Sequence, residues 1–452
     1  MKQPFELTIA EASLLIHNKE LSAVELMESC LRRSNSIDDK LRIWANIDPE
    51  TILKEASNKS STVPCPGSSC LNGIPIGVKD IFNVSGMPNT AGSELYSNFV
   101  PKYDSAPVEF LKQAGAIIMG KTITTEFAMG DPPITKNPWN FFHTPGGSSS
   151  GSAVGVAAKV FPAALGSQTA GSVIRPASFN GIVGFKPSFG LISRFGVLPV
   201  SSSLDTVGLF ARCVEDISIV SNALAGYDHR DFSSGKVPKE DYLAQCKNIK
   251  SPPRIGLVSW FFLETCDIQA KNATLKASRI LEEHGASVEE IEIDCDSQTL
   301  LSAHQTIMSV EAAVVHKQDF NQHGDLYSPF IKDVIERGLL TTSISYIQAQ
   351  RIRRIFRQKL EQAISKFDIL LTTATDAGAP KDLETTGNPS YQVPWTMAGL
   401  PVISLPCGLD RNGLPLGIQI VGHLYDEANL LSYAKWCESI LATQLPESNM
   451  EI

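Results

Sequence analysis

Two segments rich in Gly and Ser hold the residues of this chain that are best suited to chemistry. The second of them, residues 166–177 (GSQTAGSVIRPA), has mostly small side chains up to Ser172. A turn of small residues can present several consecutive backbone N–H groups to one point, which is what an oxyanion needs. A hydroxyl at the end of such a turn, here Ser172, is well placed to attack a carbonyl. This segment therefore indicates nucleophilic catalysis by a serine.

The first segment, residues 145–152 (PGGSSSGS), has three interpretations on its residues alone. As a phosphate-binding loop it lacks the G-x-x-x-x-G-K-[ST] order, and no Lys follows it. As a flexible linker it is badly placed, because it lies between a strand-like and a helix-like segment rather than between domains. A catalytic loop is the third interpretation, and the residues alone do not decide among the three.

A serine nucleophile needs a base, because its hydroxyl is inert at its ordinary pKa. His143 is the only histidine near the two segments, and the G-x-S-x-G motif of α/β-hydrolases is absent. The other choice is a lysine that desolvation keeps neutral. Lys79 suits that role, since it ends the apolar run IPIGV and is followed by Asp80.

The elements that must position these residues follow from periodicity and turn signals. Residues 1–60 are predicted to be helical, with capping boxes that begin at Thr8 and Ser22. In residues 71–210, short apolar runs alternate with Gly/Ser/Thr-rich turns, and the small-residue run 153–165 is predicted to be a closely packed helix.

The second half of the chain continues the alternation. Residues 254–293 predict a strand–helix–strand unit, with Gly285 directly after the helix. Residues 342–365 predict a helix with a solvated basic face, and residues 367–442 complete the sheet with a strand, a hairpin and a last helix. Strands and helices alternate and no linker interrupts them. We therefore expect an α/β fold: one domain over residues 1–452, with a mixed, mostly parallel central sheet covered by helices on both faces.

Composition limits the classes of function. The chain has 452 residues, 43% hydrophobic and 19% charged, with a net charge of −9. This predicts a folded protein rather than a disordered one, and it disfavours binding to nucleic acid. No stretch has the length and apolarity of a membrane span, and the nine scattered cysteines predict reduced thiols in a cytoplasmic protein. Cys65 and Cys70 lack the further ligands of a zinc site, so neither a metal nor a cofactor is expected.

Several motifs stand in a fixed order along the chain: GIPIGVKD, TPGGSSSGSA and GSQTAGSVIRPA, followed by GIVGFKPS, SLDTVG and the C-terminal WTMAGLPVISLPCG and GLPLGIQIVG. In these motifs and their order the chain resembles a known family, the amidase signature family of amide hydrolases. The motifs span essentially the whole chain and are densest between residues 71 and 210. The 24 residues from Ser148 to Ser172 match the two-serine spacing of the family.

The resemblance implies a Ser–Ser–Lys triad. Ser172 matches the nucleophile, Lys79 the base, and Ser148 the bridging serine, which in this family follows a cis peptide bond. The backbone N–H groups that hold the oxyanion are then those of Thr169, Ala170, Gly171 and Ser172.

Two departures from the commonest family pattern stand close to the nucleophile. Gln168 replaces an acidic residue and Ala170 replaces a glycine, which predicts altered rather than lost activity. Arg175 lies three rather than two residues after Ser172; it either pairs with a substrate carboxylate or braces the loop through backbone carbonyls. Met129 is a candidate for the wall of an apolar substrate pocket, although a place in the core is the more common outcome for such a residue.

The resemblance implies hydrolysis of the C–N bond of a linear carboxylic amide, extending to esters or carbamates of similar shape, by a stand-alone enzyme. A small-molecule amide is the expected partner, and an enzyme of this size is commonly a homodimer. The alternative is the amidase subunit of a tRNA-dependent amidotransferase, which releases ammonia from glutamine. Gln168 and the spacing from Ser172 to Arg175 fit the usual pattern of that subunit poorly.

Overall fold

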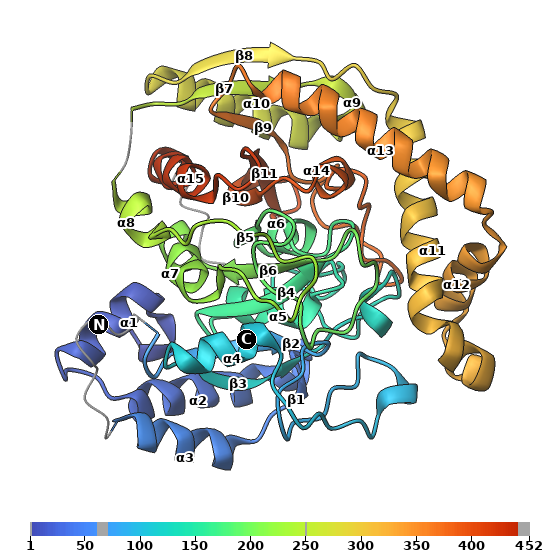
Figure 1. Ribbon diagram of the computed structural model, residues 1–452. Helices are drawn as coiled ribbons and strands as arrows, with labels where there is room; N and C mark the ends of the chain where they lie inside the picture. The colour runs from blue at the N-terminus through green and yellow to red at the C-terminus, as the bar shows by residue number, and fades with distance from the viewer. Residues whose placement is uncertain (1, 61–70, 249–250, 442–452) are drawn as a thin grey trace.

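A computed structural model describes residues 2–60, 71–248 and 251–441 of the chain (Figure 1). One mixed sheet runs through the molecule in the order β1-β3-β2-β4-β6-β5-β10-β11-β9-β7-β8. Its strands are β1 Trp44–Asn46, β2 Pro75–Lys79, β3 Ile117–Thr122, β4 Ala163–Gln168, β5 Val183–Lys186, β6 Thr206–Ala211, β7 Arg254–Val258, β8 Ser287–Ile291, β9 Ile369–Thr373, β10 Val402–Leu409 and β11 Pro415–Val421.

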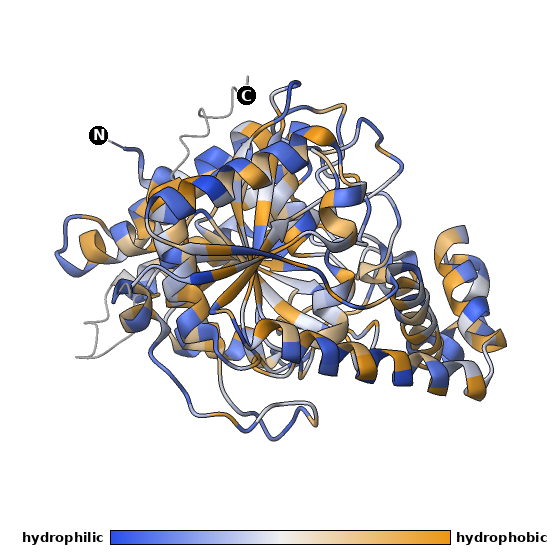
Figure 2. Cartoon of the chain, turned by 90° about the horizontal axis from the view of Figure 1, so that it is seen from above, coloured by the Kyte–Doolittle hydropathy of each residue, from blue (hydrophilic) through white to orange (hydrophobic). Residues whose placement is uncertain are grey.

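Helices pack on both faces of this sheet. They are α1 Ile9–His17, α2 Ala23–Leu41, α3 Pro49–Ser60, α4 Ala106–Gln113, α5 Ser150–Ala157, α6 Ile174–Asn180, α7 Val214–Leu224, α8 Tyr242–Lys247, α9 Trp260–Thr265, α10 Ile268–Glu283, α11 Ser297–His323, α12 Pro329–Leu340, α13 Ser343–Ile364, α14 Val393–Ala398 and α15 Glu427–Leu441, with short 3₁₀ turns η1 Pro4–Glu6, η2 Glu94–Tyr96, η3 Glu126–Ala128 and η4 Gly324–Leu326. Helices α4, α7, α15 and α10 contact the strands and pack one on the next, and α5 and α6, which also contact strands, pack on each other. Apolar strands cross the middle of the molecule, and hydrophilic residues gather on the helices around them (Figure 2).

The single-domain α/β fold and the mixed sheet agree with expectation, but the prediction that the sheet is mostly parallel is wrong. Within the described residues, six of its ten strand pairings are antiparallel. Parallel neighbours need a crossover, which a helix supplies between β2 and β3 and between β7 and β8. The centre instead contains the β10–β11 hairpin and the β5–β6 pair, and the chain returns there without a helix.

Several local predictions are confirmed in atomic detail. Thr8 and Ser22 accept hydrogen bonds in complete capping boxes at the starts of α1 and α2. Gly285 has φ +103° directly after α10 and its C-cap residue, as expected of a residue that follows a helix C-terminus. The hairpin turn before β11 places Gly413 at φ +77°.

The predicted helix over residues 153–165 is only half present. Helix α5 ends at Ala157, and β4 begins at Ala163. Lys159 takes a left-handed conformation, φ +60°, and Pro162 follows, so the chain cannot stay helical. The small residues thus serve a helix and a buried strand in turn.

Helices α11, α12 and α13 stand together at one side of the sheet (Figure 1). Helix α13 begins after its Thr342 cap, as predicted, but its basic residues are not all solvated. The Arg353 side chain is buried and donates to the backbone oxygens of Met397 and Ser203, because α13 packs over the loop before β6. No helix in the described part of the chain is long and apolar enough to cross a membrane.

Candidate active site

Two parallel neighbouring strands bring Lys79, the predicted base, to residues 169–173, the turn between β4 and α6 that is predicted to be catalytic and is called the catalytic turn below. Strands β2 and β4 pair with Val78 opposite Leu165, so Lys79 at the end of β2 lies next to the last residues of β4. The turn that leads to α6 begins directly after Gln168. The carboxyl ends of the two parallel strands therefore meet where the site is built.

Lys79 is fully buried and has two hydroxyl partners. Its Nζ lies 2.7 Å from Ser148 Oγ and 2.8 Å from Ser167 Oγ. Burial holds the pKa of Lys79 well below the usual value for lysine, and the negative charge of Asp205 opposes that shift. A lysine in these surroundings favours the neutral amine, which is the form that can accept a proton.

Ser148 is held through the backbone on both sides. The Gly147–Ser148 peptide bond is cis, as the resemblance implied. The Ser148 carbonyl accepts a hydrogen bond from the Thr125 N–H at 3.3 Å, and Gly147 O accepts one from Arg175 Nη2 at 2.8 Å. These two backbone hydrogen bonds hold the Ser148 hydroxyl in place against Lys79.

Ser172 lies in the turn between β4 and α6, and 8% of its surface is exposed. Within the described part of the chain its hydroxyl makes no hydrogen bond, so the structure joins Lys79 to Ser148 but does not join Ser148 to Ser172. A serine hydroxyl turns about a single bond, χ1, and can change partner without any movement of the backbone. The Ser172 hydroxyl, the predicted nucleophile, is thus free to face a substrate.

The backbone around Ser172 offers unused donors. In the described residues, the N–H groups of Ala170, Gly171 and Ser172 donate to no protein acceptor. A role for the N–H of Thr169, the fourth predicted oxyanion donor, stays a prediction. Backbone N–H groups in a buried turn are rarely left unpaired, and three in succession form a suitable cradle for an oxyanion. Gln168 supports the turn from below: its Oε1 accepts from the N–H groups of Val173 and Ile174.

The other two predicted residues, Arg175 and Met129, lie near the site. Arg175 is 4% exposed and donates from Nη2 to Gly147 O and to Thr386 Oγ1, which is the bracing arrangement. Burial lowers the pKa of Arg175 to about 10. Met129 packs in the main hydrophobic core. Its segment is linked to the site through Thr125, whose backbone N–H donates to Ser148 O and whose Oγ1 donates to Met129 O. A role for Met129 in binding substrate stays a prediction.

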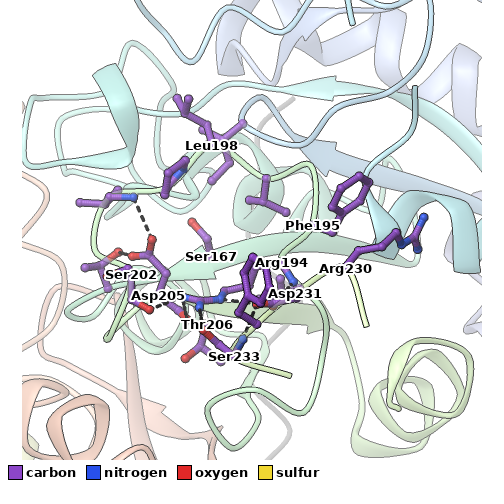
Figure 3. Close-up of a pocket in the computed structure, with 17 residues that line it drawn as sticks. Ser167, Arg194, Phe195, Leu198, Ser202, Asp205, Thr206, Arg230, Asp231 and Ser233 are labelled. Atoms are coloured by element: carbon purple, nitrogen blue, oxygen red, sulfur yellow. Dashed lines mark hydrogen bonds and ion pairs between the residues drawn. The ribbon is translucent and has the colours of Figure 1, made fainter. Parts of the chain in front are cut away.

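A cavity of about 360 Å³ opens beside Ser167, one of the two partners of Lys79 (Figure 3). Ser167 and Asp205 line it on the polar side, and Phe195, Leu198 and Val207 are among its apolar walls. Asp205 is fixed because it accepts hydrogen bonds from Thr169 Oγ1 at 2.5 Å and from the backbone N–H groups of Val200 and Ser201. The hydroxyl that touches the Lys79 amine therefore also faces this space.

Sequence reasoning misses three contributors to the site. Ser167 escapes notice because it lies inside an apolar strand, and only the pairing of β2 with β4 brings it to Lys79. His304, on α11, contacts the carbonyl of Thr169 across 135 positions of the chain. Arg353 belongs to the basic face that is predicted to be solvated, yet it is buried. Only the Ser167 position carries a local signal, since it lies in the GSQTAGS motif.

The described residues hold no group of three or more His, Cys, Asp or Glu side chains arranged for a metal ion. Cys65 and Cys70 lie outside the described residues.

Known proteins are similar to this chain over nearly its whole length. The protein-family model described as Amidase covers residues 25–431. A glutamyl-tRNA(Gln) amidotransferase subunit from Nostoc sp. is 35% identical over 467 residues, which cover 94% of this chain and 96% of that protein.

Solved structures superpose along nearly the full length. One belongs to a vestigial protein complex that reveals the evolutionary origins of an s-triazine catabolic enzyme, with TM-score 0.89 and 27% identity over 96% of this chain and 98% of that chain. Another is a peptide amidase from Stenotrophomonas maltophilia, with TM-score 0.84 and 28% identity over 96% of each chain.

Proposed function

This chain belongs to the amidase family, and from that premise we propose that it hydrolyses the C–N bond of a linear carboxylic amide through an acyl-enzyme on Ser172. The observation that carries the proposal is the environment of Lys79: a fully buried amine with two hydroxyl partners, 2.7 and 2.8 Å away. Such an amine is a base, and the nearest proton that it can take is that of the bridging hydroxyl.

In the proposed reaction a proton first moves from Ser172 through Ser148 to Lys79, and then returns from Lys79 to the leaving group. Neutral Lys79 takes the proton of Ser148, which takes the proton of Ser172 as Oγ attacks the carbonyl carbon. The carbonyl electron pair moves onto oxygen, where the N–H groups of Ala170, Gly171 and Ser172 hold it. When the C–N bond breaks, the proton returns from Lys79 through Ser148 to the leaving nitrogen. Water then attacks the ester by the same route and frees Ser172.

The cavity beside Ser167 is suited to the amine half of the substrate. The leaving nitrogen must receive its proton from the Lys79–Ser148 pair, so it departs on the side where those residues lie. The cavity is lined by Ser167, the other hydroxyl partner of Lys79, and by both polar and apolar residues. We therefore expect the size of the amine to be limited by this space, whereas the acyl group lies on the opposite side of the scissile bond.

The sequence relatives, which are glutamyl-tRNA(Gln) amidotransferase subunits, favour a second candidate, the ammonia-releasing component of a tRNA-dependent amidotransferase. Both candidates share the Ser172 acyl-enzyme and differ in substrate and in dependence on a partner. The structural relatives, which include a peptide amidase, favour a free-standing enzyme. Homodimerisation and a cytoplasmic location stay predictions.

The deciding experiment treats the two candidates in parallel. Purified protein is assayed for ammonia or amine release from a panel of amides with acyl group and amine varied independently, and from glutamine with and without partner proteins and tRNA. Release by the chain alone, lost in Ser172→Ala together with labelling by a fluorophosphonate, supports the free amidase. Glutamine hydrolysis only in the presence of partner and tRNA supports the amidotransferase component. Full activity in Ser172→Ala contradicts both.

A further inference from the structure

Three successive carbonyl groups in the catalytic turn each accept a hydrogen bond from another part of the fold. Thr169 O accepts from His304 Nε2 at 3.0 Å. Ala170 O accepts from Thr396 Oγ1 at 2.9 Å, and Gly171 O accepts from the backbone N–H of Arg175 at 3.0 Å. The turn is therefore bonded on its carbonyl side, while its N–H groups are left free.

Each of these carbonyls shares a peptide group with one of the free donors. The Thr169 carbonyl belongs to the peptide that carries the Ala170 N–H, and the next two carbonyls belong to the peptides of the Gly171 and Ser172 N–H groups. A proton donated to the oxygen of a peptide draws electron density from its nitrogen, which makes the N–H a stronger donor. The same bond fixes the plane of the peptide and so the direction in which the N–H points.

Of these three donors, His304 is the titratable one, and it comes from a distant helix. It lies on α11, 5% of its surface is exposed, and burial lowers its pKa to about 4. The bond to Thr169 O opposes that shift, and Arg353 adds to it. The ring is therefore neutral near pH 7. Because a carbonyl only accepts, its Nε2 must carry the hydrogen.

We propose that His304 is a positioning residue for the oxyanion site: its Nε2–H, donated to the Thr169 carbonyl, orients and polarises the peptide whose N–H, on Ala170, stabilises the tetrahedral intermediate. This rests on the proposed function, because the oxyanion forms only if Ser172 attacks a carbonyl. It also gives the α11 helix a role in the chemistry, although no atom of that helix touches the reacting groups.

A purely structural role for His304 is the competing explanation. It predicts that any substitution that preserves the fold preserves the reaction. The positioning role predicts dependence on a donor at the place of Nε2, so the test compares two side chains of equal length. In His304→Gln an amide nitrogen can donate from that place, whereas in His304→Met nothing can.

The chain provides a matched control on the same helix. His316 is also buried, and burial likewise lowers its pKa to about 4. Its Nδ1 lies 3.3 Å from Tyr327 Oη, and the ring packs against Phe127. His316→Met therefore removes a buried imidazole from α11 without changing a bond to the catalytic turn.

The first measurement is kinetic. In His304→Met we expect kcat to fall by about tenfold with KM nearly unchanged, less than the loss of a whole oxyanion donor. His304→Gln should recover most of kcat, and His316→Met should keep it. Affinity for a boronate that mimics the oxyanion should fall with kcat, while affinity for the carboxylic acid product stays constant. Equal kcat in His304→Met and wild type, with both folded, overturns the inference.

The second measurement does not depend on activity. With ¹⁵N-labelled alanine, the Ala170 amide proton resonance should move upfield in His304→Met, because its peptide loses polarisation, and should stay close to wild type in His304→Gln and His316→Met. An unchanged Ala170 resonance in His304→Met overturns the inference whatever the activity. A different outcome is that the wild type hydrolyses no amide while His304→Met still shows the expected shift of the Ala170 resonance. That result would contradict the proposed function but would support polarisation of the Thr169–Ala170 peptide by His304.

Discussion

Two buried lysines on neighbouring strands have opposite surroundings. Lys79 ends β2, Lys121 lies on β3, and neither exposes any surface. Lys121 Nζ lies 2.6 Å from Asp80 Oδ1 and also donates to Pro88 O and Asn89 Oδ1. Within the described part of the chain, Lys79 Nζ has no hydrogen-bond partners other than the hydroxyls of Ser148 and Ser167.

The difference distinguishes a lysine suited to stay a structural cation, Lys121, from one suited to act as a base, Lys79. Burial lowers the pKa of both amines, but for Lys121 the Asp80 carboxylate acts against burial as a direct partner. For Lys79 the opposing charge is that of Asp205, which makes no contact with the amine. An ammonium with a carboxylate at 2.6 Å keeps its proton, whereas an ammonium among hydroxyls loses it more easily. Thus the partner, rather than burial alone, assigns the role.

The same substitution at both positions tests this contrast most strongly. In Lys79→Met we expect kcat to fall by about 10⁴-fold or more, because the relay loses its base. The free energy of unfolding should hold or rise, since a costly buried amine is replaced by a side chain of similar size. Kinetics and denaturant unfolding measure the two quantities. A Lys79→Met variant with wild-type kcat would show that Lys79 is not the base.

Lys121→Met should have the opposite profile. It leaves the Asp80 carboxylate buried without its cation, which typically costs about 3–5 kcal/mol in the free energy of unfolding. Activity measured well below the unfolding midpoint should fall far less than in Lys79→Met. Adding Asp80→Asn should recover part of the lost stability, because the unpaired charge is then removed. Full stability in the single variant would mean that the ion pair does not stabilise the fold.

The two lysines also show which features of the site can be predicted from the sequence and which cannot. Lys79 can be found because it ends an apolar strand and a serine nucleophile needs a base. Ser148 is ambiguous on its own and gains a role only through the motif order. The partners that define Lys79, above all Ser167, depend on strand pairing, which periodicity does not specify. His304 and Arg353 depend on how α11 and α13 pack over the site, and no local pattern encodes that packing.

The fold also has features that the local sequence predicts and features that it does not. Capping boxes, the β10–β11 hairpin and the strand–helix–strand unit are local, because each is fixed by residues close together in the chain. Strand direction in the middle of the sheet is a long-range property, and there the expected parallel arrangement is wrong. The boundary between α5 and β4 escapes prediction because small apolar residues suit both elements, and the helix stops before the left-handed Lys159 and Pro162.

Ser167 offers a milder way to change the surroundings of Lys79. In Ser167→Ala the amine loses one of its two partners but keeps Ser148, so we expect kcat to fall by up to about tenfold, the worth of a single hydrogen bond. Ser221→Ala is the control: its hydroxyl is also buried, but it bonds Ile217 O within α7. If the Ser167 variant retains full kcat, Ser148 alone positions the base.

The smallest expected change is a displacement of the pH profile in Asp205→Asn. Lys79 must be neutral to act, so kcat/KM rises with pH as the amine loses its proton. The charge of Asp205 raises the pKa of Lys79 against the larger effect of burial. Without that charge the pKa falls further, and the rising limb moves to lower pH. Asn can retain an acceptor for Thr169, which limits the structural change.

The matched control for this displacement is Asp216→Asn. Asp216 is also buried and also accepts two backbone N–H groups, those of Ile9 and Ala10, but it does not act on Lys79. Its substitution should leave the rising limb in place. A limb that moves to higher pH in Asp205→Asn, or moves equally in both variants, would mean that the charge of Asp205 does not set the proton affinity of Lys79. The base would then be governed by burial and its hydroxyl partners alone.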